Sequence, residues 1–321
     1  MAHQATTPIS SADDIVLPFS TDRSRAVGRL VRLGPLADEI LNRHAYPDAV
    51  SEVLGQALAL TGMLGSTLKF GGNLIVQTQT DGPLGLLVAN FEAPGKLRGY
   101  ASFDAERRIE LPSGNRPDES TGVALGSGHM ALTIDPGGHM DRYQGIVSLE
   151  GQTLSDAANE YFRQSEQLPT FVHLAIARHH SGTSGDGEWH WRAGGLMVQY
   201  VSPVGGRQPD DEDEGGNAIW LFGEREEDWQ RVSMLAATVE DHELLDPTLA
   251  PERLLYRLFH EERVRAAEPV PLKAFCRCSR ERVATFLSTF RGDDIEDMLD
   301  DDGKIAITCE FCNQTYRFDK L

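Results

Sequence analysis

The stretches Cys276-Arg277-Cys278 and Cys309-Glu310-Phe311-Cys312 contain all four cysteines of this 321-residue chain. Two close pairs of thiols from separate segments can form a tetrahedral set of thiolates, the arrangement that zinc prefers in structural sites. The sequence therefore predicts one zinc ion per chain, bound by Cys276, Cys278, Cys309 and Cys312 in a small C-terminal domain.

The segment between the two cysteine pairs has the pattern of a small folded domain. Ser279 is placed to cap a helix that carries Val283, Phe286, Leu287 and Phe290. A second short helix is predicted over residues 293–299. Apolar residues then alternate through Ile305 and Ile307 and return through Tyr316 and Phe318, which predicts a hairpin that delivers Cys309 and Cys312 through its turn.

A domain of this size depends on its metal. A core of about fifty residues rarely supplies more than about 3–5 kcal/mol, whereas structural zinc contributes about 10–16 kcal/mol in comparable peptides. Zinc also holds cysteines as thiolates, which is the form that oxidants attack. Because each sulfur has a close partner in the sequence, oxidation can end in disulfides and expel the ion. We therefore expect a redox switch here rather than a passive structural zinc.

The chain before the cysteines has the pattern of an α+β domain. Strands are predicted at 15–19, 26–33, 73–80, 84–91, 97–103, 130–134, 143–149, 171–178 and 189–200, the last closing the sheet. Tight turns between neighbouring strands favour a largely antiparallel sheet. A helix should begin at Pro47 and stop at Gly71-Gly72, with Gly55, Gly62 and Gly65 allowing close packing on the sheet. A shorter helix is predicted over 155–167.

The predicted fold class is α+β, with a core domain, a helical linker and a four-cysteine zinc-binding domain. Residues 1–12 are expected to be a flexible lead, and 13–223 the core domain with a solvated acidic loop at 202–216. Residues 224–268 form the linker, whose helices (224–239 and 251–262) should fold only by docking on another part of the chain. The zinc-binding domain spans 269–321.

Charge and composition exclude several classes of function. With 30 Lys and Arg against 49 Asp and Glu, the formal net charge is −19, which disfavours binding to nucleic acid. The N-terminus lacks the pattern of a secretory signal, and the most apolar stretch, 49–70, is interrupted by polar residues and glycines, so no membrane span is expected. A cytoplasmic location is predicted, where clustered cysteines favour metal or redox chemistry.

Enzyme motifs are missing from the sequence. It contains no Gly-x-x-x-x-Gly-Lys-Ser/Thr loop and no Gly-x-Ser-x-Gly elbow, and the histidines, including His129, His179, His180 and His190, show no convincing metal-ligand spacing. The protein is therefore predicted not to be an enzyme.

Several segments resemble one known family. The cysteine segments 276–282 and 309–319 closely resemble the redox-regulated heat shock protein 33 family of bacterial chaperones. The resemblance extends over nearly the whole chain through Leu68-Lys-Phe-Gly71, Leu97-Arg-Gly-Tyr100, Tyr143-Gln-Gly-Ile-Val147, Tyr161-Phe-Arg-Gln-Ser-Glu-Gln-Leu-Pro-Thr170, Ala193-Gly-Gly-Leu196 and Leu254-Leu-Tyr-Arg-Leu-Phe-His-Glu-Glu262. The acidic run 210–214 is longer than the corresponding connection in that family.

The resemblance implies an ATP-independent holdase. In its reduced, zinc-bound state such a protein is inactive; oxidation forms the disulfides Cys276–Cys278 and Cys309–Cys312, releases zinc and unfolds the linker. The exposed apolar surface then holds unfolding client proteins, and a homodimer accompanies full activation.

Two other functions fit the cysteines alone. A zinc ribbon that binds nucleic acid or a protein partner would use a basic face formed by Arg277, Arg280, Arg282 and Arg291, which the acidic residues of 293–302 oppose. A thiol–disulfide oxidoreductase would need its Cys-x-x-Cys at the start of a helix, whereas here it lies in the predicted hairpin.

Overall fold

The structure of the protein is a computed structural model. It describes residues 13–68, 71–107, 122–138, 140–181, 187–200, 217–290, 295–300 and 302–319, with the side chains of 217–225 left out. The predicted flexible lead (1–12) and acidic loop (202–216) lie outside these residues.

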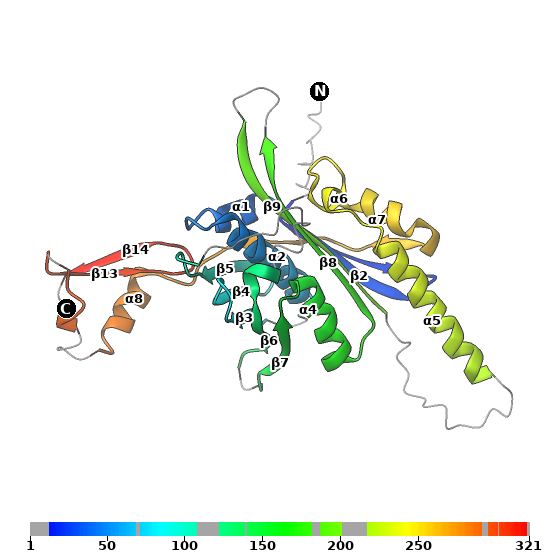
Figure 1. Cartoon of the computed structure of the whole chain (residues 1–321), viewed down its shortest axis with the longest axis horizontal. Helices are drawn as coiled ribbons and strands as arrows, with labels where there is room; N and C mark the ends of the chain where they lie inside the picture. The colour runs from blue at the N-terminus through cyan, green and yellow to red at the C-terminus, as the bar shows by residue number, and fades with distance from the viewer. Residues whose placement is uncertain are drawn as a thin grey trace, which may run out of the picture.

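Two antiparallel sheets form the core (Figure 1). The first has the order β10-β1-β2-β9-β8, with β11 also paired to β1. Its main strands are β1 (Ile15–Thr21), β2 (Ala26–Leu33), β8 (Thr170–Ser181) and β9 (Glu188–Tyr200). Because β9 lies between β2 and β8, the prediction that residues 189–200 close the sheet is wrong: this strand is central.

The second sheet has the order β12-β5-β4-β3-β6-β7. Its main strands are β3 (Asn73–Thr80), β4 (Leu86–Glu92), β5 (Lys96–Ser102), β6 (Ser127–Asp135) and β7 (Tyr143–Glu150). The pairs β3–β4, β4–β5 and β6–β7 are joined by short connections, β3 also pairs with β6, and each pairing among these five strands is antiparallel. The α+β class with antiparallel strands is thus confirmed, with two sheets where the sequence analysis foresaw one.

Helix α2 (Asp48–Gly65) packs into a core cluster that it shares with both sheets. Every residue from Ala49 to Gly65 except Glu52 is buried, as expected for a helix enclosed on almost all sides. Gly55 and Gly65 allow this contact, since an added Cβ would lie 1.9 Å from Ile176 and 2.2 Å from Phe91. The predicted close packing of these glycines is confirmed, but the helix ends at Gly65, earlier than Gly71-Gly72.

Other helices cover the rest of the core. They are α1 (Pro35–Leu41), which the sequence analysis missed, and α4 (Leu154–Tyr161), which continues as the π-helix η1 (Phe162–Glu166). Thr153 caps α4 by accepting a hydrogen bond from the Asp156 backbone N–H.

The predicted linker packs on the first sheet. It contains most of α5 (Asn217–Ala236), then α6 (Asp241–Leu245), α7 (Pro251–Phe259) and the short 3₁₀-helix η2 (His260–Glu262). The apolar stripe of α7 (Leu254, Leu255, Leu258 and Phe259) joins Leu17, Phe19, Leu30, Leu196 and Val198 of the sheet in one buried cluster. These linker helices therefore bury their apolar side chains against the core, as the docking prediction requires.

The chain then returns along the edges of both sheets. Strands β10 (Val264–Ala266) and β11 (Val270–Pro271) pair with β1, and β12 (Lys273–Ala274) pairs parallel with β5. Residues 270–274, which the sequence analysis assigned to the cysteine domain, thus pair with core strands. Through them the linker is connected directly to Cys276.

The cysteine domain is small and lies at one end of the molecule, while α5 lies at the other (Figure 1). It consists of α8 (Arg280–Leu287), capped by Ser279, and a hairpin of β13 (Lys304–Thr308) and β14 (Thr315–Asp319). The predicted cap and hairpin are confirmed. Its buried hydrophobic cluster contains Leu287, Ile295, Ile305 and Phe318.

Candidate metal centre

The four cysteines converge at the end of the hairpin. Their sulfur atoms all lie within 4.8 Å of one another. Two of these contacts join the two segments: Cys278 Sγ lies 3.2 Å from Cys312 Sγ, and Cys276 Sγ lies 3.6 Å from Cys309 Sγ. All four thiols are free, and a disulfide would need an S–S distance of about 2.05 Å.

Local backbone geometry turns the sulfurs of the hairpin toward the centre. The Asn313 N–H donates to the Cys309 carbonyl at 2.8 Å, and the Cys309 N–H donates to the Gln314 carbonyl at 3.0 Å. Asn313 has a φ of 57°, in the left-handed region that asparagine tolerates better than most residues. The turn therefore returns the chain within a few residues and presents Cys309 and Cys312 to the same point.

This donor set fits a zinc ion. Four sulfurs at the usual Zn–S distance of about 2.3 Å from a tetrahedral centre would lie about 3.8 Å apart. The measured distances of 3.2 and 3.6 Å are close to that edge length. An all-sulfur tetrahedron is typical of zinc or iron–sulfur sites, so the arrangement can hold a metal ion.

Without a cation the Cys312 thiol resists ionisation. Burial and the neighbouring Cys278 thiol raise the pKa of the Cys312 thiol. The hydroxyl of Tyr316 donates a hydrogen bond to Cys278 Sγ at 3.2 Å, and this contact raises the pKa of Tyr316 to about 12. A divalent cation favours ionisation of the thiols that it binds, because it stabilises the negative charge of coordinated thiolates.

Arg98 and Tyr100 of β5 bring the core into contact with the cysteine turn. The Arg98 guanidinium lies 4.0 Å from the centroid of the Phe311 ring. In the sequence, Phe311 stands between Cys309 and Cys312. The Tyr100 ring also packs near Phe311, with the two ring centroids 6.2 Å apart. Burial lowers the pKa of Arg98, while the nearby Cys276 and Cys309 favour its charged form. Core and metal site are therefore physically adjacent.

The end of α1 makes a second contact with the turn. The Asn313 side-chain amide donates to the Arg43 carbonyl at 2.8 Å, and His44 Nε2 lies 2.7 Å from the Glu310 carbonyl. The turn that carries two of the four sulfurs is thus held on the core through both its side chains and its main chain.

Arginines of the predicted basic face are engaged in contacts within the protein. Arg277 pairs with Glu92 at 2.8 Å, Arg280 lies over the Phe318 ring at 4.5 Å, and Arg282 donates to the Arg277 carbonyl. The fourth member, Arg291, lies outside the described residues.

Sequence reasoning found the four thiols but missed the residues around them. Arg98 and Tyr316 lie in segments that carried the family resemblance, yet nothing in their spacing indicates a contact with sulfur or with Phe311. His44 and Arg43 had no signal at all. Such contacts depend on the path of the chain between distant segments.

The fold and the site define an α+β protein whose four-thiol site, which can hold a metal ion, lies in a separate C-terminal module. The family model described as Hsp33 protein matches residues 14–319. The 33 kDa chaperonin of Caulobacter vibrioides is 41% identical over 308 residues, covering 96% of this chain and 95% of that relative. The 33 kDa chaperonin of Nitrosococcus oceani is 38% identical and covers 94% and 90%. The chain therefore belongs to the Hsp33 family of chaperones.

The fold of a solved structure agrees with this assignment. The crystal structure of the 33 kDa chaperonin (heat shock protein 33 homolog) from Thermotoga maritima matches with a TM-score of 0.72 at 23% identity, covering 96% of this chain and 95% of that one. Within the described part of the chain, no helix is long and apolar enough to span a membrane.

Proposed function

We propose that this protein is a redox-regulated, ATP-independent holdase that binds unfolding proteins and prevents their aggregation. In the resting state Cys276, Cys278, Cys309 and Cys312 hold one zinc ion as thiolates, and the linker covers the core. The proposal divides the chain into a core domain (13–223), a linker (224–268) and a zinc domain (269–321). Because clustered thiols persist in reducing compartments, we propose a cytoplasmic location.

One observation carries the proposal: the four sulfurs converge on a turn that contacts the core, in a module with a very small buried cluster. A module of this size has little stability without its metal. Unfolding of the module after loss of the metal removes the Arg98–Phe311 contact. It also frees the C-terminal end of the two-residue strand β12, which follows the linker in the chain. Oxidation of the thiols is thereby coupled to linker docking.

The activating step oxidises four thiolates to two disulfides. Four electrons pass to two molecules of hypochlorous acid, which become two chloride and two hydroxide ions, and Zn²⁺ loses its donors. The pairing Cys276–Cys278 and Cys309–Cys312 rests on the family resemblance. In the resting geometry all four sulfurs lie within 4.8 Å of one another and none is in a disulfide, so each pair must close to bonding distance on oxidation. Dimerisation of the oxidised form follows the same resemblance.

The test combines a zinc-release assay with light scattering of an aggregating client. Hypochlorite, or peroxide with heat, should release about one zinc per chain and produce suppression of client aggregation. If the oxidised protein loses zinc and client aggregation is unchanged, the proposal is wrong. Binding of RNA or DNA that is strong at low salt and lost at high salt would favour the zinc-ribbon alternative.

A further inference from the structure

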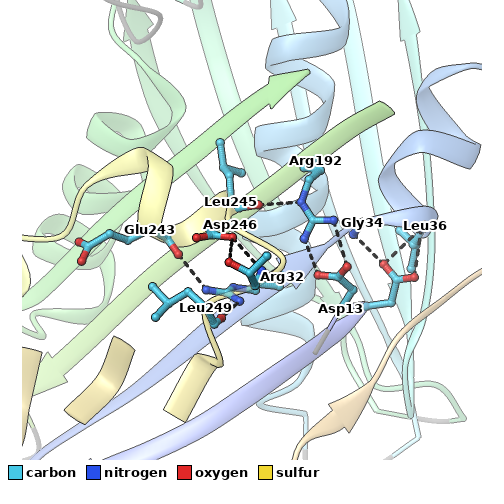
Figure 2. Close-up of polar contacts among 11 residues, drawn as sticks. Asp13, Arg32, Gly34, Leu36, Arg192, Glu243, Leu245, Asp246 and Leu249 are labelled. Atoms are coloured by element: carbon cyan, nitrogen blue, oxygen red, sulfur yellow. Dashed lines mark hydrogen bonds and ion pairs between the residues drawn. The ribbon is translucent and has the colours of Figure 1, made fainter. Parts of the chain in front are cut away.

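Two arginines of the core sheet hold the linker through its main chain (Figure 2). Arg32 of β2 is fully buried and donates to the carbonyl oxygens of Glu243, at 2.8 Å, and Leu249. Arg192 of β9, which is 7% exposed, donates from Nε to the Leu245 carbonyl at 2.7 Å. Together the two guanidiniums hold three main-chain oxygens from the end of α6 and the segment before α7.

These hydrogen bonds are independent of the linker's side chains. Carbonyls at the C-terminal end of a helix have no partner within the helix, so they accept from outside groups. Glu243 and Leu245 are in the last turn of α6, and Leu249 precedes the first turn of α7. Another polypeptide with free carbonyls at similar positions would offer the arginines the same acceptors.

Arg192 also has a partner outside the linker. Arg192 forms an ion pair with Asp13, with Nη1 and Oδ2 3.0 Å apart, and Asp13 lies two residues before β1 (Figure 2). Arg32 Nε has no hydrogen-bond acceptor among the described residues although it is buried. Arg192 is therefore held in the core without the linker, and Arg32 retains a donor that the linker does not use.

We propose that Arg32 and Arg192 also form the client-binding site of the activated protein, where they bind main-chain carbonyls of an apolar segment of an unfolded polypeptide. This inference rests on the proposed function and specifies how that function recognises clients. When the linker leaves, both guanidiniums lose their linker carbonyls beside the apolar surface of Leu17, Phe19, Leu30 and Leu196, while Arg192 keeps its ion pair with Asp13.

The chemistry selects unfolded over folded partners. In native proteins more than about 90% of buried carbonyls are already hydrogen-bonded, whereas an unfolded chain exposes both its carbonyls and its apolar side chains. Hydrogen bonds from a charged donor in apolar surroundings are stronger than those between neutral groups. Because acceptors of this kind occur in every polypeptide, the site can bind clients of unrelated sequence.

The experiment separates client binding from linker docking. Its probe is fluorescently labelled, carboxymethylated α-lactalbumin, which stays unfolded. Arg32→Met and Arg192→Met remove one donor each. Leu254→Ala is the matched control, because Leu254 is a fully buried linker residue whose loss weakens docking while both arginines remain. Arg32→Lys keeps the positive charge but loses the two-pronged donor and should rank between wild type and Arg32→Met.

In the oxidised state, Leu254→Ala should bind the probe like wild type, and each methionine variant about ten-fold more weakly. In the reduced, zinc-loaded state, Leu254→Ala and Arg32→Met should both have protease-sensitive linkers, but only Leu254→Ala should bind the probe well. Oxidised methionine variants with wild-type affinity would overturn the inference and leave the arginines with a docking role alone. If oxidised wild type fails to bind the probe, the proposed function itself fails.

Discussion

Arg231 and Glu262 form an ion pair that joins the two ends of the linker. Arg231 of α5 donates from Nε to Glu262 Oε1 at 2.6 Å and from Nη2 to Oε2 at 3.3 Å. The Glu262 side chain is only 1% exposed, whereas that of Arg231 is 35% exposed. The Glu262 carbonyl also accepts from the Arg23 N–H at 3.2 Å, which ties η2 to the turn between β1 and β2.

We predict that Arg231→Met weakens docking of the linker, because it leaves the carboxylate of Glu262 buried without its partner. Removing one member of a buried pair costs about 3–5 kcal/mol. Since water reaches Arg231, we expect a smaller loss of about 2 kcal/mol. That loss corresponds to an increase of about 30-fold in the undocked fraction of the linker.

Hydrogen–deuterium exchange of α5 and α7 in the reduced, zinc-loaded protein measures this fraction. The control is the double variant Arg231→Met with Glu262→Met, in which two apolar side chains replace the pair and docking should recover most of the loss. Unchanged exchange protection in Arg231→Met would refute the reasoning. The reasoning would also be refuted if α5 and α7 exchanged as fast in the double variant as in Arg231→Met, because the unpaired charge of Glu262 would then not be the cause of the undocking.

Three further perturbations have defined outcomes. Burial raises the pKa of Glu262, but hydrogen bonds from Arg231 and Ser24 outweigh it, and the pKa lies below the ordinary 4.5; its contribution is therefore present above pH 4.5 and lost as the pH falls below that value. Exchange of α7 should thus rise more in acid for wild type than for the double methionine variant; equal rises would contradict this. Cys309→Ser should lower zinc affinity and make the linker protease-sensitive without oxidant, and unchanged zinc affinity and protease sensitivity would argue against a four-thiolate site. Phe311→Ala removes the ring under Arg98 and should cost about 2–4 kcal/mol of module docking, seen as faster exchange in the turn at residues 309–314; protection equal to wild type would mean that the main-chain contacts suffice.

Much of the local structure was predictable from the sequence. The alternating pattern of residues 26–33 and the apolar spacing of 305–318 correctly predicted strands, because a half-buried strand needs one apolar face. The cap at Ser279 followed from the same kind of local rule. The sequence predicted that this helix ends at Gly71-Gly72, but it ends at Gly65. Gly65 packs closely against Phe91 at that point.

The sequence did not predict the shortest strands, because two or three residues cannot show an alternating pattern of apolar and polar side chains. Strands β10, β11 and β12 have two or three residues each, and their pairing with β1 and β5 depends on partners far away in the sequence. The number of sheets was missed for the same reason. Strand patterns indicate which face is buried but not which strands are neighbours.

The sequence by itself determined the chemistry of the metal site and the family, because four cysteines with specific spacing leave few alternatives and the resemblance spans nearly the whole chain. Only the tertiary structure decided what surrounds that chemistry: Arg98 over Phe311, Arg231 on Glu262, and Arg32 and Arg192 on the linker carbonyls. A ligand set is recognisable from residue type and local spacing. A contact between an arginine and a main-chain oxygen some 200 residues away leaves no such pattern, because every residue has a carbonyl and only the fold selects which one is reached.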